Sequence, residues 1–254
     1  METPRRPIAL ITGGSRGIGA ATTLALAQRG YDVVITYRNK SARANEVVAA
    51  STRYGVRALA VACDITQQEQ VTELYQTISS WSQGHFSLLV LNASGGMERD
   101  LLAADPDYPM HINRDAQLFL VEGALPLLSN GGDIVFITSH WAHLYGQIKQ
   151  LPDYTFVAES KHAGEQALRA RLPEFTARNI RLLIVTGDLI AGTITPKLLE
   201  RSAPGLAAQR ISIAGTLPTA EEMGEIIAAS AVDPALPSGH VVVVGGTLES
   251  LPLR

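Results

Sequence analysis

The sequence predicts an α/β protein built on a single Rossmann-type, doubly wound parallel sheet of about seven strands, with helices on both faces. Two observations predict it. Short apolar runs alternate with helix-like segments along the whole chain, and these runs have no solvated face of their own. A glycine-rich turn directly follows the first run, as it does in dinucleotide-binding folds.

The elements follow each other in the order that a doubly wound sheet requires. Strand–helix alternation with right-handed crossovers places all strands parallel in one sheet. The expected strands are 8–12, 32–36, 56–63, 88–92, 133–138, 180–186 and 240–244. The expected helices are 17–29, 41–53, 67–82, 109–128, 153–172 and 219–231. Residues 187–218 interrupt the alternation, are rich in Gly, Pro and small residues, and are expected to form a substrate lid with a short helix at 196–203.

Length and composition narrow the class of protein. The 254 residues are expected to form one domain, 1–254. With 46% hydrophobic residues, 18% charged residues and a net charge of −3, the chain lacks the basic excess of nucleic-acid binders. Cys63 is the only cysteine, which excludes an internal disulfide and a thiolate metal cluster and agrees with a cytoplasmic location. No apolar run approaches the roughly 18 residues of a membrane span, so no membrane partner is expected. No metal is expected either, because His140 and His143 have no third ligand nearby in the sequence.

The turn after the first strand predicts a nucleotide site. Its glycines allow a tight turn and close approach to a pyrophosphate, and the following helix presents free N–H groups at its amino end. The turn consists of Thr12, Gly13, Gly14, Ser15, Arg16, Gly17, Ile18 and Gly19.

Two arginines favour NADPH as the cofactor. The second strand ends without the acidic residue that would hold the ribose 2′-hydroxyl of NAD, and Arg38 stands there instead. Together with Arg16 it offers fork-shaped donors that suit a 2′-phosphate. The alternative is that both arginines are solvated surface residues.

These motifs resemble the short-chain dehydrogenase/reductase family over nearly the whole chain. The turn is similar to the family's TGxxxGIG loop, and Asn92-Ala93-Ser94-Gly95 resembles its NAG turn, with Ser94 in place of the usual glycine. The resemblance implies further roles. Asp64 and Ile65 would contact the adenine, Asn113 would hold a proton-relay water, Ser139 would be catalytic, and Gly187 and Thr193 would contact the nicotinamide half of the cofactor. The family also implies a homotetramer.

The catalytic helix departs from the family's common YxxxK pattern. Val157 stands four residues before Lys161, and the nearest tyrosine is Tyr154, seven residues before it. Tyrosine, six residues and lysine is the spacing of the family's enoyl-acyl-carrier-protein reductases, and the stretch resembles the helix of the type III enzymes.

Helix geometry allows the shifted tyrosine to work. At about 100° per residue, a separation of seven leaves two side chains about 20° apart, so Tyr154 and Lys161 would share a face if Asp153 capped the helix. The shift moves the tyrosine backbone about 4.5 Å toward the helix start. In ketone reduction the carbon that accepts the hydride is about 1.2 Å from the oxygen that needs a proton donor. In conjugate reduction the hydride goes to the β-carbon, roughly 3 Å from that oxygen, so a tyrosine displaced along the helix suits conjugate reduction.

The resulting roles are specific. Lys161 would hold the nicotinamide ribose and lower the pKa of Tyr154, which would donate to the developing enolate, with Ser139 as a second donor. The alternatives are that Tyr154 is only a packing residue at the start of the helix and that the Ser139 hydroxyl only forms hydrogen bonds with backbone groups at the end of its strand. Trp141 and Tyr145 are expected to line the acyl pocket or to pack at a subunit contact; for Asp188 the sequence gives no physical account.

Three functions compete at this point. The first is NADPH-dependent reduction of an activated C=C bond, such as that of an enoyl thioester in fatty-acid or natural-product biosynthesis. The second is a ketoreductase acting on a 3-ketoacyl thioester or a small ketone, since Ser139, Asn113 and Lys161 would be shared. The third is a nucleotide-binding sensor without turnover, which Val157 keeps open.

Overall fold

A seven-stranded parallel sheet forms the centre of the protein. The computed structural model describes residues 6–83, 86–128 and 131–253. The strand order is β3-β2-β1-β4-β5-β6-β7, with every pair parallel. The strands are β1 Ile8–Ile11, β2 Asp32–Tyr37, β3 Ala58–Ala62, β4 Leu88–Leu91, β5 Gly132–Ser139, β6 Ile180–Gly187 and β7 Val241–Val244. All seven expected strands and the doubly wound topology are confirmed.

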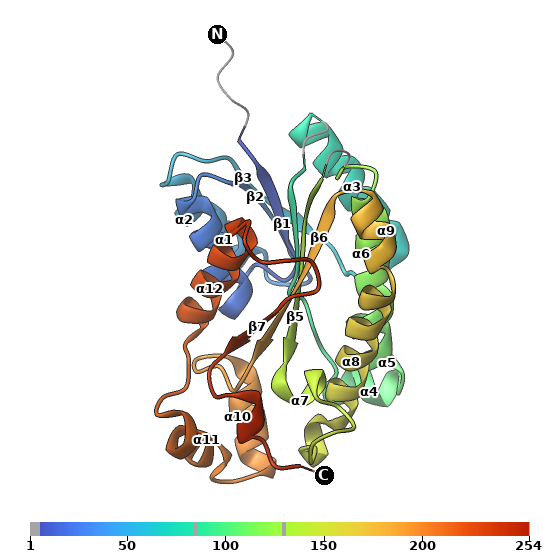
Figure 1. The fold of residues 1–254 in the computed structure, drawn as a ribbon. Coiled ribbons are helices and arrows are strands. Elements are labelled where there is room, and N and C mark those ends of the chain that lie inside the picture. The colour runs from blue at the N-terminus through green and yellow to red at the C-terminus, as the bar shows by residue number, and fades with distance from the viewer. Residues whose placement is uncertain (1–5, 84–85, 129–130, 254) are drawn as a thin grey trace.

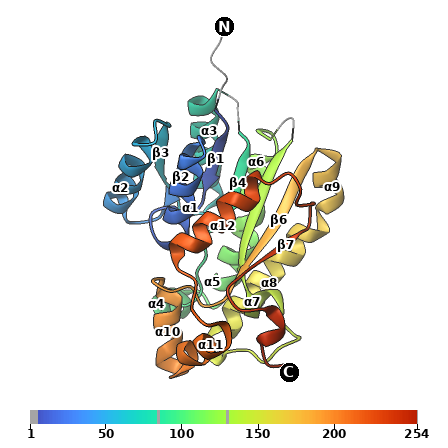
Figure 2. The ribbon, with the colours of Figure 1, turned by 60° about the vertical axis from the view of Figure 1, so that its left-hand side comes forward.

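Helices cover both faces of the sheet (Figures 1 and 2). On one face lie α1 Gly17–Gln28, α2 Ser41–Thr52 and α12 Ala220–Val232. On the other lie α3 Gln68–Ser82, α6 Ala116–Ala124, α8 Thr155–Ala170 and α9 Leu172–Ala177. Because side chains alternate along each strand, neighbouring residues enter different cores: Phe136 packs with the α3, α6 and α8 face, and Val135 with the α1 and α12 face.

The carboxyl edge of the sheet carries smaller elements, seen at the bottom of Figure 1. They are α4 Arg99–Ala104, α5 Tyr108–Met110, α7 His140–His143, α10 Ile194–Ser202 and α11 Leu206–Ala214, with 3-10 turns at Pro152–Tyr154 and Leu248–Ser250. The expected lid segment therefore holds two helices, of which the sequence predicted the first. A third cluster of buried apolar residues lies among these elements, and Trp141, Val157 and Leu199 belong to it.

Two expected helices are interrupted. The segment expected at 109–128 contains a π-helical turn at His111–Asp115 between α5 and α6. The segment expected at 153–172 starts as a 3-10 turn and becomes α-helical only at Thr155. No helix in the described part of the chain is long and apolar enough to cross a membrane.

Candidate active site

The glycine turn has the backbone that a dinucleotide site needs. Gly13 and Gly17 have φ values of +65° and +54°, in the left-handed region that favours glycine. A Cβ on Gly19 would lie 2.5 Å from the carbonyl oxygen of Gly13, so only glycine allows this close approach. No side chain caps the amino end of α1, whose N–H groups can therefore bind an anion. The residues of this turn fit a dinucleotide pyrophosphate.

A hydrogen-bond network joins the glycine turn to the end of β4. The Asn92 side-chain amide donates to the Thr12 carbonyl over 2.9 Å. The Thr12 hydroxyl accepts from the backbone N–H groups of Asn92 and Ala93, both over 3.0 Å. The two loops that the sequence assigned to the cofactor therefore form one rigid unit.

The residues assigned to the adenosine end lie beside this unit. Arg38 is exposed and donates to the hydroxyl of Tyr108 over 2.9 Å, which holds its guanidinium at the end of β2. Arg16 is exposed at the amino end of α1, and Ser15 is half-buried beside it. The Asp64 carboxylate accepts from the N–H and hydroxyl of Thr66 and closes the turn before α3.

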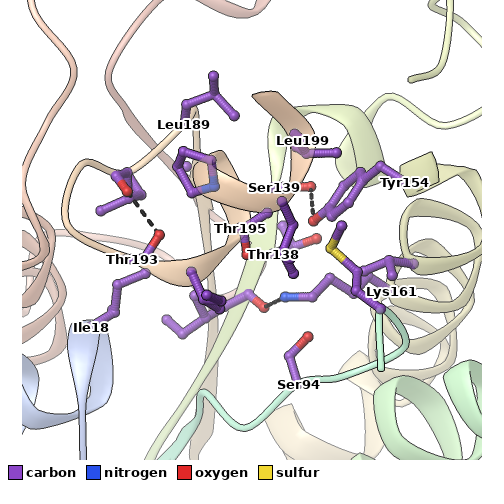
Figure 3. A pocket seen from close by; sticks show the side chains of 18 of the residues that line it. Ile18, Ser94, Thr138, Ser139, Tyr154, Lys161, Leu189, Thr193, Thr195 and Leu199 are labelled. Atoms are coloured by element: carbon purple, nitrogen blue, oxygen red, sulfur yellow. Dashed lines mark hydrogen bonds between the residues drawn. The ribbon is translucent and has the colours of Figure 1, made fainter. Parts of the chain in front are cut away.

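A cavity of about 270 Å³ opens at the carboxyl edge of the sheet. Figure 3 shows Ile18, Ser94 and Thr193 around it, together with Tyr154, Ser139 and Lys161. Nine of the residues assigned from the sequence line it: Arg16, Ile18, Asn92, Ser94, Ser139, Tyr154, Lys161, Gly187 and Thr193. The others do not line it: Gly17 and Gly19 lie in α1, Asn113 in the π-helical turn and Ile65 in the core.

Tyr154 reaches the cavity from a position that the sequence misjudged. Asp153 is not the cap of α8; it lies in the 3-10 turn, and Tyr154 itself precedes the first residue of the α-helix. The Tyr154 side chain is buried, and its hydroxyl donates to Ser139 Oγ over 3.0 Å (Figure 3). The shifted tyrosine and the serine therefore meet, as a shared catalytic role requires.

The ionisation of Tyr154 differs from the sequence-based expectation. Burial raises the pKa of Tyr154, and the hydrogen bond with Ser139 opposes this rise only in part. Lys161 is not among the causes of the shift, so the expected lowering by Lys161 is wrong for this structure. Tyr154 is a protonated donor at neutral pH.

Ser139 connects the end of β5 to α7. Its Oγ accepts from the N–H of Ala142 over 3.2 Å, which caps α7, and also accepts from Tyr154. With two donors directed at its oxygen, the Ser139 proton is available to another acceptor in the cavity.

Lys161 is buried on α8 and points into the cavity (Figure 3). Its ammonium donates to the carbonyl oxygen of Ile137 over 3.3 Å. Burial lowers the pKa of Lys161 to about 8, because the charged form loses hydration.

The lowered pKa of Lys161 predicts a pH profile. Lys161 is charged below about pH 8, so kcat/KM, which reports groups of the free enzyme, should fall as the pH rises through about 8. Arginine stays charged throughout, so in Lys161→Arg the fall at pH 8 should be absent whatever the residual rate. Steady-state rates between pH 6 and 10 check this; an identical fall in both enzymes would assign it to another group.

Asn113 lies in the π-helical turn and fastens a loop to α8. Its amide donates to the Gly95 carbonyl over 2.9 Å and to the Ser160 hydroxyl over 3.0 Å. A Cβ on Gly164 of α8 would come 2.2 Å from the Asn113 carbonyl, so this glycine permits the close contact between the two segments. Asn113 thus holds α8, and with it Lys161, against the loop after β4.

The histidines after Ser139 serve the fold. His140 is fully buried, accepts from the Thr186 hydroxyl at Nδ1 and donates to the Gly246 carbonyl from Nε2; burial lowers its pKa. His143 pairs with the buried Glu165 over 2.9 Å. The described residues contain no group of three or more metal-ligating side chains.

Two features of the site have no local sequence signal. Asp188, unexplained by the sequence, forms a buried ion pair with Arg210 of α11 over 2.7 Å. The Thr138 hydroxyl is buried, lines the cavity and has no hydrogen-bond partner among the described residues, which leaves it available to a ligand. The ion pair could not be predicted from the sequence because its two residues are 22 positions apart. The role of Thr138 could not be predicted because a threonine within an apolar strand is an ordinary strand residue.

A glycine turn suited to a dinucleotide, facing a tyrosine, a serine and a lysine across one cavity, is typical of a Rossmann-type dinucleotide-binding protein. Residues 7–202 match the family model for short chain dehydrogenase, and the chain belongs to this family.

Named relatives are reductases. A hydroxynaphthalene reductase-like protein of Metarhizium robertsii is 35% identical over 175 residues, which are 66% of this chain and 64% of that protein. A 1-cyclohexenylcarbonyl-CoA reductase of Streptomyces collinus is 32% identical over 192 residues, 73% of this chain and 65% of that protein. The matches thus span slightly less than two thirds of these relatives' length.

Solved structures share the fold over the whole chain. A short-chain dehydrogenase/reductase mutant of Serratia marcescens superposes with a TM-score of 0.82 at 24% identity, over 98% of this chain and 100% of that one. A short chain dehydrogenase of Burkholderia cenocepacia in complex with NADP gives a TM-score of 0.79 at 27% identity, over the same shares of both chains.

Proposed function

We propose that the protein is an NADPH-dependent reductase of a conjugated C=C bond, with an enoyl thioester as substrate. One observation carries the proposal: the Tyr154 hydroxyl lies 3.0 Å from Ser139 Oγ in the cavity that Lys161 also lines. At the common tyrosine position stands Val157, which is buried and lines the same cavity without a proton to give.

The chemistry follows from these positions. NADPH, when bound, would supply a hydride to the β-carbon of the substrate, and negative charge would then develop on the thioester oxygen. On substrate binding the Tyr154 hydroxyl would turn from Ser139 Oγ to that oxygen, and both hydroxyls would donate hydrogen bonds to it as its negative charge develops. Charged Lys161 would hold the cofactor ribose and add a positive potential beside the developing enolate, and a proton taken up from solvent at the α-carbon would complete the reduction.

The named relatives bear on the choice between C=C and C=O reduction. The Streptomyces relative takes its name from 1-cyclohexenylcarbonyl-CoA, which is itself a conjugated enoyl thioester. The Metarhizium relative is named for hydroxynaphthalene reduction, which keeps a ketoreductase as the second candidate. The tyrosine displaced toward the helix start favours the first.

A product assay tests the proposal directly. The enzyme with NADPH receives a short trans-2-enoyl thioester in one reaction and the matching 3-ketoacyl thioester in another, and products are identified by mass. We expect the saturated thioester from the first. A 3-hydroxy thioester from the second alone would establish the ketoreductase, and no product from either would favour the nucleotide-binding sensor.

The cofactor preference depends on Arg38 and Arg16. We expect Arg38→Ala to raise the KM for NADPH by about tenfold to a hundredfold and leave that for NADH nearly unchanged, since charge-assisted bonds to a phosphate contribute about 1.5–3 kcal/mol. Arg16→Ala should act in the same direction. The exposed Arg53 at the end of α2 gives a matched control, Arg53→Ala. An equal rise in the KM for NADPH and for NADH in Arg38→Ala would refute a contact with the 2′-phosphate.

A further inference from the structure

The part of the cavity near Tyr154 is apolar and includes one large aromatic side chain. Trp141 of α7 is 4% exposed and lines the cavity together with Val157, Leu189 and Leu199. Figures 1 and 2 place α7 on the side of the molecule away from α1 and the glycine turn. An acyl group that extends from the reacting carbons away from the cofactor would therefore meet this apolar lining.

Trp141 is braced by a buried ion pair. The guanidinium carbon of Arg210 lies 5.8 Å from the centroid of the Trp141 ring. Arg210 is held by Asp188 over 2.7 Å and by the Ser250 hydroxyl over 2.9 Å, and the Asp188 and Arg210 side chains are only 1% and 3% exposed. Displacing Arg210 would leave a buried carboxylate without its partner, which is strongly unfavourable. The Asp188–Arg210 ion pair therefore resists any movement of the Trp141 ring toward Arg210.

The loop that follows Trp141 is also fastened. The Gln150 amide donates to the Trp141 carbonyl over 3.1 Å. The Lys149 N–H donates to the Pro252 carbonyl over 3.0 Å, and Ile148 forms an antiparallel bridge with Leu253. The carboxy-terminal segment thus ties this loop in place beside Tyr154.

The space left for the acyl group is small. The whole cavity measures about 270 Å³, below the roughly 300–1,000 Å³ of typical ligand pockets, and the nicotinamide needs part of it. We infer that Trp141 is a rigid wall that restricts the substrate to a short or ring-sized acyl group and excludes long straight chains. The inference rests on the proposed thioester function and assigns the acyl class and the residue that selects it.

Binding of thioesters that cannot react tests the wall separately from the reaction. Isothermal titration calorimetry of the enzyme with NADPH would use the saturated butanoyl, cyclohexanecarbonyl and octanoyl thioesters of N-acetylcysteamine, which offer no C=C bond to reduce. For the wild-type enzyme we expect the octanoyl thioester to bind at least tenfold more weakly than the cyclohexanecarbonyl thioester. Trp141→Ala should tighten octanoyl binding at least tenfold, and Trp141→Leu provides a milder change if the alanine variant does not fold.

Trp81 of α3 offers a matched control, because Arg57 also lies over its ring, 4.2 Å from the centroid, but Trp81 does not line the cavity. Trp81→Ala should bind all three thioesters as the wild-type enzyme does. Equal wild-type affinity for the octanoyl and cyclohexanecarbonyl thioesters, or no gain for octanoyl in either Trp141 variant, would overturn the inference. An enzyme that shows the expected binding but reduces no enoyl thioester would refute the proposed reaction while supporting the role of Trp141 in restricting the acyl group.

Discussion

Replacing Tyr154 with phenylalanine is expected to lower kcat by about 10²–10⁴-fold, the range that a positioned proton donor contributes. The phenol is buried, directed at Ser139 and protonated, because burial raises the pKa of Tyr154. The ring of phenylalanine fills the same space, so NADPH affinity and the folded structure should be retained. Single-turnover rates with NADPH and an enoyl thioester measure the effect, and cofactor fluorescence measures binding.

Tyr54 provides the control for this substitution. It is 47% exposed, and its hydroxyl accepts from Gln28 at the surface. Tyr54→Phe should keep the wild-type rate. A Tyr154→Phe enzyme within threefold of wild-type turnover would remove Tyr154 from the mechanism and leave it as a packing residue.

Replacing Lys161 with methionine is expected to make the protein more stable and nearly inactive. Burial lowers the pKa of Lys161 to about 8 from an ordinary value of 10.5, and at about 1.36 kcal/mol per pKa unit this costs about 3 kcal/mol of folding free energy at neutral pH. Methionine has a similar shape and no charge to bury. Turnover should fall by about 10²–10³-fold, as for loss of other electrostatic groups that stabilise a developing negative charge.

The stability gain of Lys161→Met has a defined pH dependence. Between about pH 8 and 10.5 the unfolded chain holds a proton on Lys161 that the folded protein does not, so the wild-type free energy of unfolding rises with pH in this window. The advantage of the variant should therefore be full below about pH 8 and shrink toward pH 10.5. Urea unfolding at pH 7 and pH 10 measures it, with the exposed Lys149→Met as control; a variant less stable than wild type at pH 7 would contradict the account.

The parts of the fold that follow repeating patterns were predictable from the sequence. Each buried parallel strand is an apolar run in the sequence, and the glycine pattern identifies the turn after the first strand. The sheet and the nucleotide loop could therefore be predicted without knowledge of contacts between distant residues. Helix geometry predicted that Tyr154 and Lys161 face one cleft, and both line the cavity although that geometry proved only approximate. The 3-10 turn at Pro152–Tyr154 replaced the first turn of an α-helix, yet it still directs the phenol into the cavity.

The rest depends on contacts between distant segments. Asp188 and Arg210 form their ion pair only once residues 187–218 have folded at the end of β6, and neither residue belongs to a sequence motif. The Arg38–Tyr108 hydrogen bond likewise spans 70 residues. Short helices such as α7 and α11 depend on packing against the carboxyl edge, because isolated helices of this length are marginal in water. The homotetramer stays a prediction.

The position of the transferred hydride tests the central claim most directly. The enzyme would be supplied with NADPH carrying deuterium at both hydrogen positions of the nicotinamide C4 and with a trans-2-enoyl thioester, and the product would be analysed by NMR. Conjugate reduction predicts a saturated thioester with deuterium on the β-carbon and solvent hydrogen on the α-carbon. An unreacted enoyl thioester, together with deuterium at the carbinol carbon of a 3-hydroxy product when the 3-ketoacyl thioester is supplied, would contradict it.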